Sequence, residues 1–172
     1  MQRNQVTFAS IAVSLMLAGC VPVVIPQDAA QPLRDQPALS NCPVPARSAT
    51  DVPQVVALMN AERGRAGLAP LILSAKISAV AQAFACENAA RGSITHTGTD
   101  GSNLTERLRR GGVAASMVSE NTAALYGTPA GVVAAWMASP PHRANILRPN
   151  ARAVGVGQAD GARAAWVVDF TS

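Results

Sequence analysis

Apolar residues recur at helical spacing in two stretches of the chain. The first stripe consists of Val52, Val55, Val56 and Met59. The second stripe consists of Ile77, Val80, Ala81 and Phe84. Positions i, i+3, i+4 and i+7 share one face of a helix, so each stripe predicts an amphipathic helix. Glycines at positions 64 and 67 follow the first stripe, and Gly92 follows the second; they predict where the two helices end.

Shorter elements are marked by their caps. Asn103 and Glu106 form a capping-box pattern that predicts a short helix ending at Gly111. Residues 117–126 are predicted to be extended. Thr128 with Pro129 predicts the start of a fourth helix, and Ser139 with Pro140 the start of a short fifth helix that reaches Leu147.

The C-terminal residues alternate as strands do. Val154 and Val156 alternate with glycines, and a second alternating stretch covers residues 166–170. Asp160-Gly161 between them is a hairpin-turn signal. Helices followed by a terminal hairpin predict an α+β domain.

The first residues have a different pattern. Arg3 is followed by an uncharged apolar run from Val6 to Leu17, which ends in small residues. This layout is typical of a secretory signal, and the run is shorter than the roughly 20 residues of a membrane-spanning helix. Leu17-Ala18-Gly19-Cys20 resembles a bacterial lipobox, so we expect cleavage before Cys20 and acylation of its thiol. An ordinary signal peptide with a chance cysteine is the alternative.

The signal implies three regions. Residues 1–19 are predicted to be the signal peptide, 20–50 a lipid-anchored, Pro-rich tether and 51–172 the folded domain. The tether contains half of the 12 prolines of the chain and would extend at most on the order of 90 Å. We therefore expect an extracytoplasmic lipoprotein bound to membrane lipid through Cys20. Val21 follows the cysteine where aspartate would signal inner-membrane retention, which favours an outer membrane.

Charge and aromatic content narrow the partners. Without Arg3, 13 basic residues face 10 acidic ones, and Arg109-Arg110 is the only adjacent basic pair. Nucleic-acid binding requires basic clusters with stacking aromatics, which the chain does not have, so no nucleic-acid partner is expected. The arginines are interpreted as solvated surface, near anionic lipid or cell-wall polymer.

Few residues are candidates for chemistry. The short motifs of serine hydrolases, zinc proteases, thiol redox proteins and phosphate-binding loops are absent. The chain has two histidines, His96 and His142, and both lie in polar segments. A structural role is open for either, but their polar setting favours function.

The motifs in order resemble the CAP superfamily, which comprises cysteine-rich secretory proteins, antigen 5 and pathogenesis-related proteins, and most closely its bacterial SCP-like branch. The resemblance covers about residues 52–172 and rests on these pieces: Val56-x₃-Asn60-x₂-Arg63-x₃-Gly67-Leu68-Ala69-Pro70-Leu71; the loop His96-Thr97-Gly98-Thr99-Asp100-Gly101-Ser102 with Arg107-Leu108 after it; Glu120-Asn121; Trp136-Met137-x-Ser139-Pro140-x-His142-Arg143-x-Asn145-Ile146-Leu147; Gly155-Val156-Gly157; and Asp169-Phe170.

The resemblance implies an α-β-α sandwich with an antiparallel sheet between helical layers. It also implies a cleft lined by two histidines and two acids, which binds divalent metal in some members. His96, Glu120 and His142 match three of these four positions, and the fourth falls near Ser139, which is not an acid. Pro141 stands where glycine is more usual.

Three chemical roles are possible for His96, Glu120 and His142. Two imidazoles and a carboxylate suit Zn²⁺, and a catalytic zinc site needs three protein ligands. Glu120 with one histidine can instead form a general acid/base pair, with Asn121 either orienting Glu120 or capping a turn. His142 lies in the first turn of a short helix, where the local dipole disfavours a charged imidazole and favours an anionic ligand.

We therefore weigh three functions. The first is a binding module whose cleft, formed by His96, Glu120, Ser139 and His142, takes a small or lipid-like ligand or a divalent metal. The second is a hydrolase of peptide or cell-wall substrates that uses His96, Glu120 and His142. The third is a structural envelope protein with an idle cleft. Binding ranks above hydrolysis because no nucleophile motif is present.

A disulfide between Cys42 and Cys86 is also predicted. Once Cys20 is acylated, these are the two remaining thiols, and export supplies an oxidising compartment. The helical spacing from Ile77 places Cys86 opposite the apolar stripe, where it can meet the tether.

Overall fold

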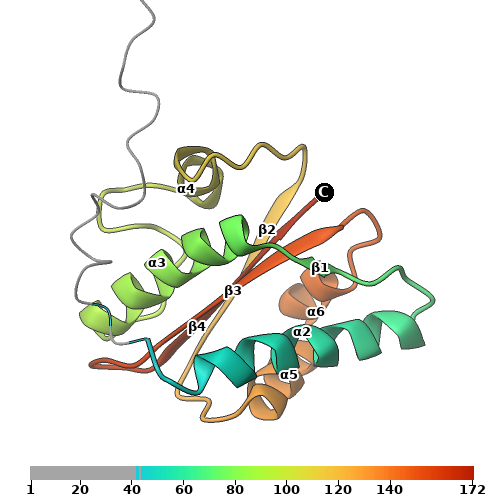
Figure 1. Ribbon diagram of the computed structural model, residues 1–172, viewed down its shortest axis with the longest axis horizontal. Coiled ribbons are helices and arrows are strands. Elements are labelled where there is room, and N and C mark those ends of the chain that lie inside the picture. Colours follow the sequence, from blue (N-terminus) through green and yellow to red (C-terminus); the bar gives the residue numbers. More distant parts are fainter. Residues whose placement is uncertain (1–41, 43) are drawn as a thin grey trace, which may run out of the picture.

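The computed structural model describes Cys42 and residues 44–172. The predicted signal peptide, Cys20 and the tether as far as residue 41 lie outside the described residues. The elements are α2 (Ser48–Arg65), β1 (Ile72–Leu73), α3 (Ala75–Arg91), α4 (Leu104–Arg110), β2 (Val118–Ala124), α5 (Pro129–Ala138), α6 (Pro140–Ile146), β3 (Ala153–Ala159) and β4 (Ala165–Thr171). Each predicted helix and strand is present (Figure 1).

The strands form one sheet in the order β1-β3-β4-β2. The three long strands pair antiparallel, while the two-residue β1 pairs parallel with β3. Strand β2 is therefore an edge strand, paired only with β4 among the described strands. The sheet is thus mixed, with antiparallel pairing between all of its long strands.

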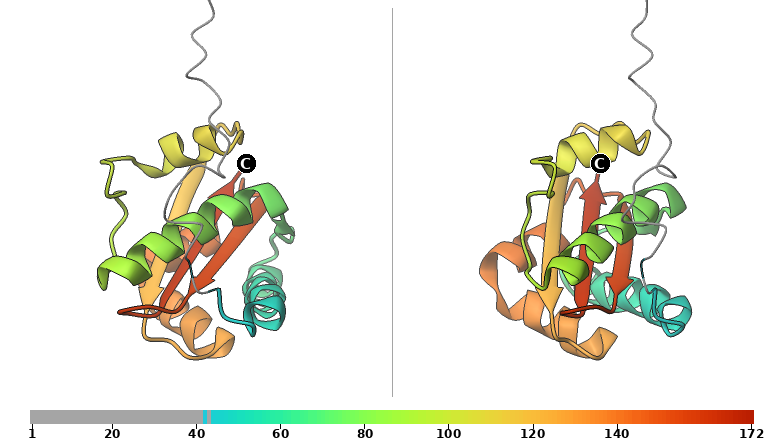
Figure 2. Two further views of the ribbon diagram at one scale, coloured as in Figure 1. Left: turned by 60° about the vertical axis from the view of Figure 1, so that its left-hand side comes forward. Right: turned by 90° about the vertical axis from the view of Figure 1, so that its left-hand side faces the viewer.

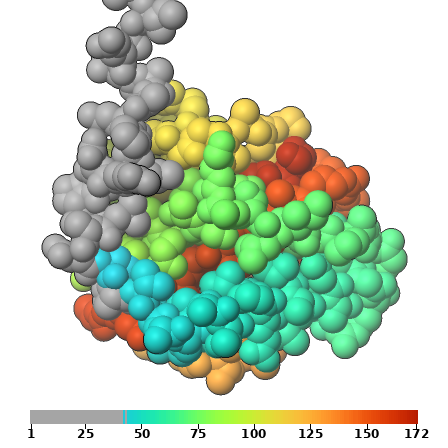
Figure 3. Space-filling view, viewed as in Figure 1, coloured from blue at the N-terminus to red at the C-terminus, as the bar shows by residue number. Residues whose placement is uncertain are grey.

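Helices cover both faces of the sheet, which confirms the α-β-α sandwich. Helix α3 crosses one face, and α5 and α6 lie behind it (Figure 2). On the second face the stripe of α2 packs with Val133, Trp136 and Ile146 against alternate residues of β3 and β4. In the space-filling view, α2 and α3 leave a strip of the strands visible between them (Figure 3).

Two glycines allow α3 to lie directly on the sheet. A Cβ on Gly155 would stand 2.2 Å from the backbone carbon of Ile77, and one on Gly157 would stand 2.4 Å from that of Ala81. Both distances are far below van der Waals contact. The alternation of valine and glycine in β3 therefore has a packing cause: valines fill the face under α2, and glycines admit the backbone of α3.

Several local expectations change in detail. The β3–β4 connection runs over residues 160–164, because Ala159 pairs with Ala165, and it is longer than a two-residue turn. Gly161 there is needed for close approach, since a Cβ would lie 2.8 Å from the carbonyl oxygen of Ala89. Ser139 stands at the start of α6, but its side chain makes no capping hydrogen bond.

The predicted disulfide between Cys42 and Cys86 is confirmed, with a Cα–Cα distance of 5.4 Å. The reasoning about the helix face was wrong, however. Cys86 is buried in a cluster with Phe84, Ala89 and Val167, because α3 is covered on most of its circumference. Cys42 packs against this cluster from outside.

The interpretation of the arginines as solvated surface was wrong for Arg63 and Arg107, which are both buried. Arg63 has no exposed surface and donates to four backbone carbonyls, those of Ala69, Ile146, Arg148 and Ala151. It ties the end of α2 to the segment after α6. Among the described residues, no helix has the length and apolar character needed to cross a membrane.

Candidate functional site

The site is built around Glu120 and Asn121, two adjacent residues of the edge strand β2. Successive side chains of a strand point to opposite faces of the sheet. Glu120 therefore points towards the layer of α3 and α4, and Asn121 towards the layer of α5 and α6. Each of the two residues contacts a segment that carries one of the histidines.

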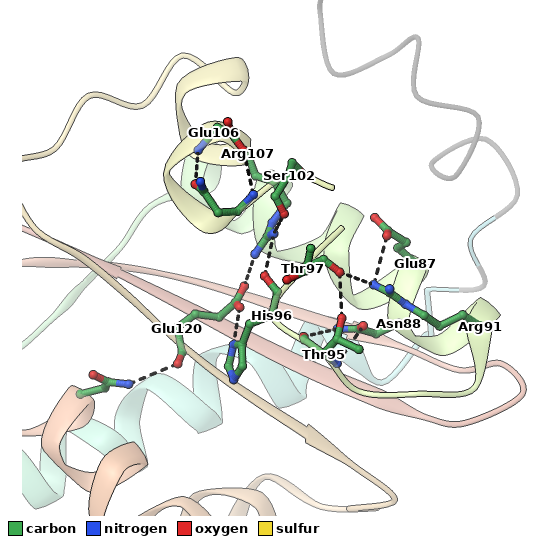
Figure 4. Close-up of polar contacts among 12 residues, drawn as sticks. Glu87, Asn88, Arg91, Thr95, His96, Thr97, Ser102, Glu106, Arg107 and Glu120 are labelled. Atoms are coloured by element: carbon green, nitrogen blue, oxygen red, sulfur yellow. Dashed lines mark hydrogen bonds and ion pairs between the residues drawn. The ribbon is translucent and has the colours of Figure 1, made fainter. Parts of the chain in front are cut away.

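On the first face, Glu120 is held between a base and a fixed cation. Its Oε1 lies 2.7 Å from Nδ1 of His96, and its Oε2 accepts a hydrogen bond of 2.7 Å from Arg107 (Figure 4). The side chain of Glu120 is 3% exposed, so neither oxygen is freely hydrated. Both carboxylate oxygens are thus engaged within the protein.

Arg107 fixes this arrangement from α4. One guanidinium nitrogen donates to the carbonyl oxygens of His96 and Ser102, at 3.1 and 3.0 Å. The guanidinium carbon also lies 3.6 Å from the centre of the Phe84 ring, in the range of a cation–π contact. Arg107 was noted from sequence only as part of the family pattern. No spacing signal could have shown that it joins the histidine loop to the carboxylate.

His96 presents the opposite edge of its ring to solvent. Its side chain is 59% exposed, while Nδ1 is fixed against Glu120. A proton on Nδ1 donates to the carboxylate, which leaves Nε2 available to a ligand. The hydrogen bond that His96 donates to Glu120, and the charge of that carboxylate, raise the pKa of His96 above its ordinary value, against the opposing effects of burial and of Arg107.

The backbone around His96 is held by the last turns of α3 (Figure 4). We call residues 95–102 the His loop. Asn88 pairs with both the N–H and the carbonyl of Thr95, each at 3.4 Å. Arg91 donates to the carbonyl of Thr97 at 3.1 Å, and the N–H of Thr99 donates to Glu87. The loop is closed internally by the N–H of Gly98, which donates to the carbonyl of Ser102 at 2.8 Å.

On the second face, Asn121 holds the helix that carries His142. Its amide donates to the carbonyl of His142 at 3.1 Å and accepts from Asn145 at 2.9 Å. Asn145 also donates to the carbonyl of Glu120 at 3.2 Å. The sequence offered two roles for Asn121, orienting the Glu120 carboxylate or capping a turn. The structure shows neither: Asn121 attaches α6 to β2.

His142 is half-buried, and its side chain makes no hydrogen bond to the described residues. Burial lowers the pKa of His142, and the charge of His96 lowers it further. The direction agrees with the expectation of a neutral imidazole, but burial is the largest cause. The two histidines are thus electrostatically coupled although they come from different layers.

Ser139 connects α5 to α6 on the same side as His142. Its N–H donates to the carbonyl of Trp136 at 3.2 Å, and its carbonyl accepts from the N–H of Arg143 at 2.8 Å. Its side chain makes no hydrogen bond to the described residues. Its contacts here are those of a connection between two helices.

A second acid, Asp169, lies behind Glu120 on β4. The two residues are direct cross-strand partners, and Asp169 has no exposed surface. Neither of its carboxyl oxygens has a hydrogen-bond partner among the described residues. Burial, and then the charge of Glu120, raise the pKa of Asp169 well above its usual range. The sequence analysis included Asp169 in the family pattern but gave it no role.

The described residues contain no group of three or more His, Cys, Asp or Glu side chains arranged to hold a metal ion. The contacts of Glu120 are consistent with this, because His96 and Arg107 already occupy its two oxygens. In this arrangement Glu120 orients His96, much as a carboxylate behind a metal-bound histidine orients that ring in metal sites.

Comparison with known proteins places these contacts in a family context. The model of the cysteine-rich secretory protein family matches residues 56–170. The uncharacterized protein YkwD of Bacillus subtilis (strain 168) is 33% identical over 117 residues, which cover 68% of this chain and 45% of that protein.

Solved structures share the fold. An extracellular protein containing a SCP domain from Bacillus anthracis str. Ames is 26% identical with a TM-score of 0.65, over 69% of this chain and 39% of that one. An outer surface protein from Borrelia burgdorferi is 20% identical with a TM-score of 0.68, over 73% and 94% of the two chains. The chain therefore spans less than half the length of two of these three proteins, YkwD and the Bacillus anthracis protein.

Proposed function

This chain belongs to the cysteine-rich secretory protein family, and on that premise we propose that it is an extracytoplasmic binding module for a small or lipid-like ligand. His96 and His142 are the proposed recognition groups. The location is supported by the Bacillus anthracis relative, which is an extracellular protein. We further propose that acylated Cys20 anchors the module to membrane lipid.

One observation carries the assignment of the binding site. His96 exposes 59% of its side chain while Nδ1 is fixed by a buried carboxylate at 2.7 Å. An exposed imidazole usually rotates freely and loses side-chain entropy when it binds. Here the ring is already oriented, so a ligand at Nε2 meets a pre-organised donor or acceptor.

A divalent metal is a narrower form of the same proposal. Zn²⁺ would take Nε2 of His96 and a nitrogen of His142, and Glu120 would support His96 rather than act as the third ligand. Two protein ligands are fewer than the three of catalytic zinc sites. The residues therefore do not fit a complete metal site as they stand, and no step of the proposed function depends on a metal.

A hydrolase is the second candidate, because the contact between His96 and Glu120 is that of a general base oriented by a carboxylate. The raised pKa of His96 favours proton transfer near neutral pH. Binding still ranks first, since no serine, threonine or cysteine side chain of the described residues is hydrogen-bonded to His96 or His142. The idle-site alternative predicts neither binding nor turnover.

The test uses the full chain with three probes: a short-chain phospholipid, soluble peptidoglycan fragments and Zn²⁺. Binding is measured by the rise in melting temperature, because a ligand stabilises the folded state that it binds. His96→Gln and His142→Gln should abolish the rise given by the phospholipid. Lys76→Gln, an exposed change on α3 that leaves both histidines in place, is the matched control and should keep it.

The other results decide between the alternatives. Stabilisation by Zn²⁺ alone that both histidine variants lose would make the module a metal site. Cleavage of the peptidoglycan fragments that His96→Gln abolishes would establish the hydrolase instead. If no probe binds and both variants melt lower than the parent, the site is structural and the proposed function is wrong.

A further inference from the structure

The last turns of α3 carry three residues that hold the His loop. Glu87, Asn88 and Arg91 are close in sequence, and their side chains reach backbone atoms of Thr95, Thr97 and Thr99. Figure 4 shows these contacts grouped on one side of the loop, with His96 between them and Glu120. The position of His96 therefore depends on where this part of α3 lies.

The disulfide joins α3 at the same place. Cys86 directly precedes Glu87 and bonds to Cys42, which is 44 residues earlier in the chain. The amide of Gln82, one turn earlier on α3, lies 3.4 Å from the sulfur of Cys86 and donates to the carbonyl of Gln158 at 2.8 Å. The bond thus attaches the segment before α2 to the part of α3 that organises the loop.

Where that segment enters α2, two further polar contacts hold it to β3 and to the β3–β4 connection. Arg47 pairs with Asp160 at 2.7 Å in the β3–β4 connection. Ser48 donates to Gln158 of β3 at 2.8 Å. Neither contact touches Glu87, Asn88 or Arg91. The disulfide and these polar contacts can therefore be separated by mutation.

The end of a helix is where local opening begins, because its last carbonyls lack partners within the helix. At the end of α3, Gly92 adopts the left-handed conformation with φ +67°, and the chain then turns into the His loop. A covalent link in this region limits the displacement of the turn that carries Glu87 and Asn88. Without the link, this turn can move away from the loop and release it while the sheet stays formed.

We propose that the Cys42–Cys86 disulfide braces the histidine site: when it is broken, the His loop is released from α3 before the rest of the domain opens. The segment that leads to the predicted tether thereby controls the order of the site. This inference concerns regulation of the site proposed above and rests on that proposal for its consequence, but the brace itself is tested without any ligand.

The test is amide hydrogen exchange on the full chain and on its Cys42→Ala variant. The N–H groups of Thr95 and Thr99 report on the loop, because they donate to Asn88 and Glu87. The N–H groups of Val167 and Val168 in β4 report on the whole fold. We expect protection at Thr95 and Thr99 to fall by at least about tenfold more than protection in β4.

Arg47→Gln is the matched control, because it detaches the same segment from Asp160 and leaves the disulfide intact. It should leave the ratio of loop to sheet protection unchanged. Reduction of the parent disulfide under native conditions is the second route and should reproduce the result for Cys42→Ala. An equal fall in loop and sheet, or loss of the whole fold by both routes, would overturn the proposal. Because no ligand is used, the brace and the proposed function can fail separately.

Discussion

At the residue scale, the chemistry of the site depends on how one buried carboxylate is shared. Glu120 meets His96 on one oxygen and Arg107 on the other. The hydrogen bond to Glu120 and its negative charge raise the pKa of His96. Burial and the positive charge of Arg107 oppose that rise. His96 then acts on His142, whose pKa it lowers.

The two histidines should titrate on opposite sides of the ordinary value near 6.5. Histidine side-chain NMR should show His96 above it and His142 below it. In His96→Gln, the pKa of His142 should rise, but it should stay below the ordinary value because burial is the larger cause. An unchanged His142 in that variant would contradict the coupling.

The contact between His96 and Glu120 also makes the stability of the fold depend on pH, with a defined sign. Because the folded-state pKa of His96 is raised, the contact with Glu120 contributes fully below the unfolded pKa near 6.5 and is lost as pH rises through the raised value. In urea unfolding, the stability difference between the parent and His96→Gln should shrink over that window. Because His96 is largely exposed, we expect a small effect.

The raised pKa of Asp169 also makes stability fall as pH rises, but here the substitution should stabilise the fold, whereas His96→Gln should destabilise it. The folded-state pKa of Asp169 is raised, so burial of its ionised form costs stability once pH exceeds the unfolded value near 3.9, and the cost grows up to the raised value. Asp169→Asn keeps the shape without the charge and should stabilise the fold at pH 8, by on the order of 1–3 kcal/mol. The gain should disappear at acidic pH. Destabilisation at both pH values in denaturant titrations would show that the acid has a bonding partner.

At the scale of elements, two kinds of contact hold the helices in place: close backbone packing against the sheet, and side chains that donate hydrogen bonds to backbone carbonyls of other segments. Helix α3 lies against Gly155 and Gly157, while α2 is fixed to the segment after α6 by Arg63. Amide side chains add a third device, since Asn60 pairs with both the N–H and the carbonyl of Leu71, at 2.7 and 3.0 Å. Asn88 pairs with Thr95 in the same way.

Alanine at two glycines should have opposite effects. Gly157→Ala would drive a Cβ into the backbone of Ala81 and should destabilise the domain by about 1–3 kcal/mol or more, or prevent folding. Gly64→Ala has nothing within 4 Å of the new Cβ and should stabilise α2 by about 0.5–1 kcal/mol. Thermal unfolding of the two variants checks both signs, and a neutral Gly157→Ala would rule out the direct helix–sheet contact.

Arg63→Met should be severe, because it leaves buried carbonyls unpaired at about 1–3 kcal/mol each, and we expect a loss of at least about 3 kcal/mol. Arg65→Met is the control, since the Arg65 side chain is 70% exposed and, among the described residues, forms an ion pair with Glu62 alone. A surface pair of that kind contributes less than about 1 kcal/mol. If the two variants lose equal free energy of unfolding in chemical denaturation, Arg63 stabilises the fold through its charge alone and not through its hydrogen bonds to carbonyls.

At the scale of the whole molecule, the sequence predicted the elements well because periodicity, caps and glycines are local signals. The stripes of α2 and α3 and the capping box of α4 became those elements. Long-range contacts were less accessible. No local pattern distinguishes a buried Arg63 or Arg107 from a solvated arginine, since their partners are carbonyls and a carboxylate that only folding brings near.

The same reason explains what was found and missed at the site. The family pattern selected His96, Glu120 and His142, but strand geometry decides that Glu120 and the adjacent Asn121 face opposite layers. The pattern could not show that Arg107 occupies one oxygen of Glu120 or that Asp169 lies buried behind it. The first fact depends on how α4 packs beside β2, and the second on the register of β2 with β4.

The position of β2 at the end of the sheet also bears on how the protein behaves in concentrated solution. An exposed edge strand can pair with strands of other molecules, because its outer carbonyl and N–H groups lack partners, and such pairing leads to self-association. Here the indole N–H of Trp136 donates to the carbonyl of Thr122 at 3.3 Å, and Asn145 donates to that of Glu120. Trp136→Phe combined with Asn145→Leu should leave the dilute protein folded but make its sedimentation coefficient rise with concentration. Asn145, which binds the Asn121 side chain that holds the helix of His142, would then also help to keep the protein monomeric.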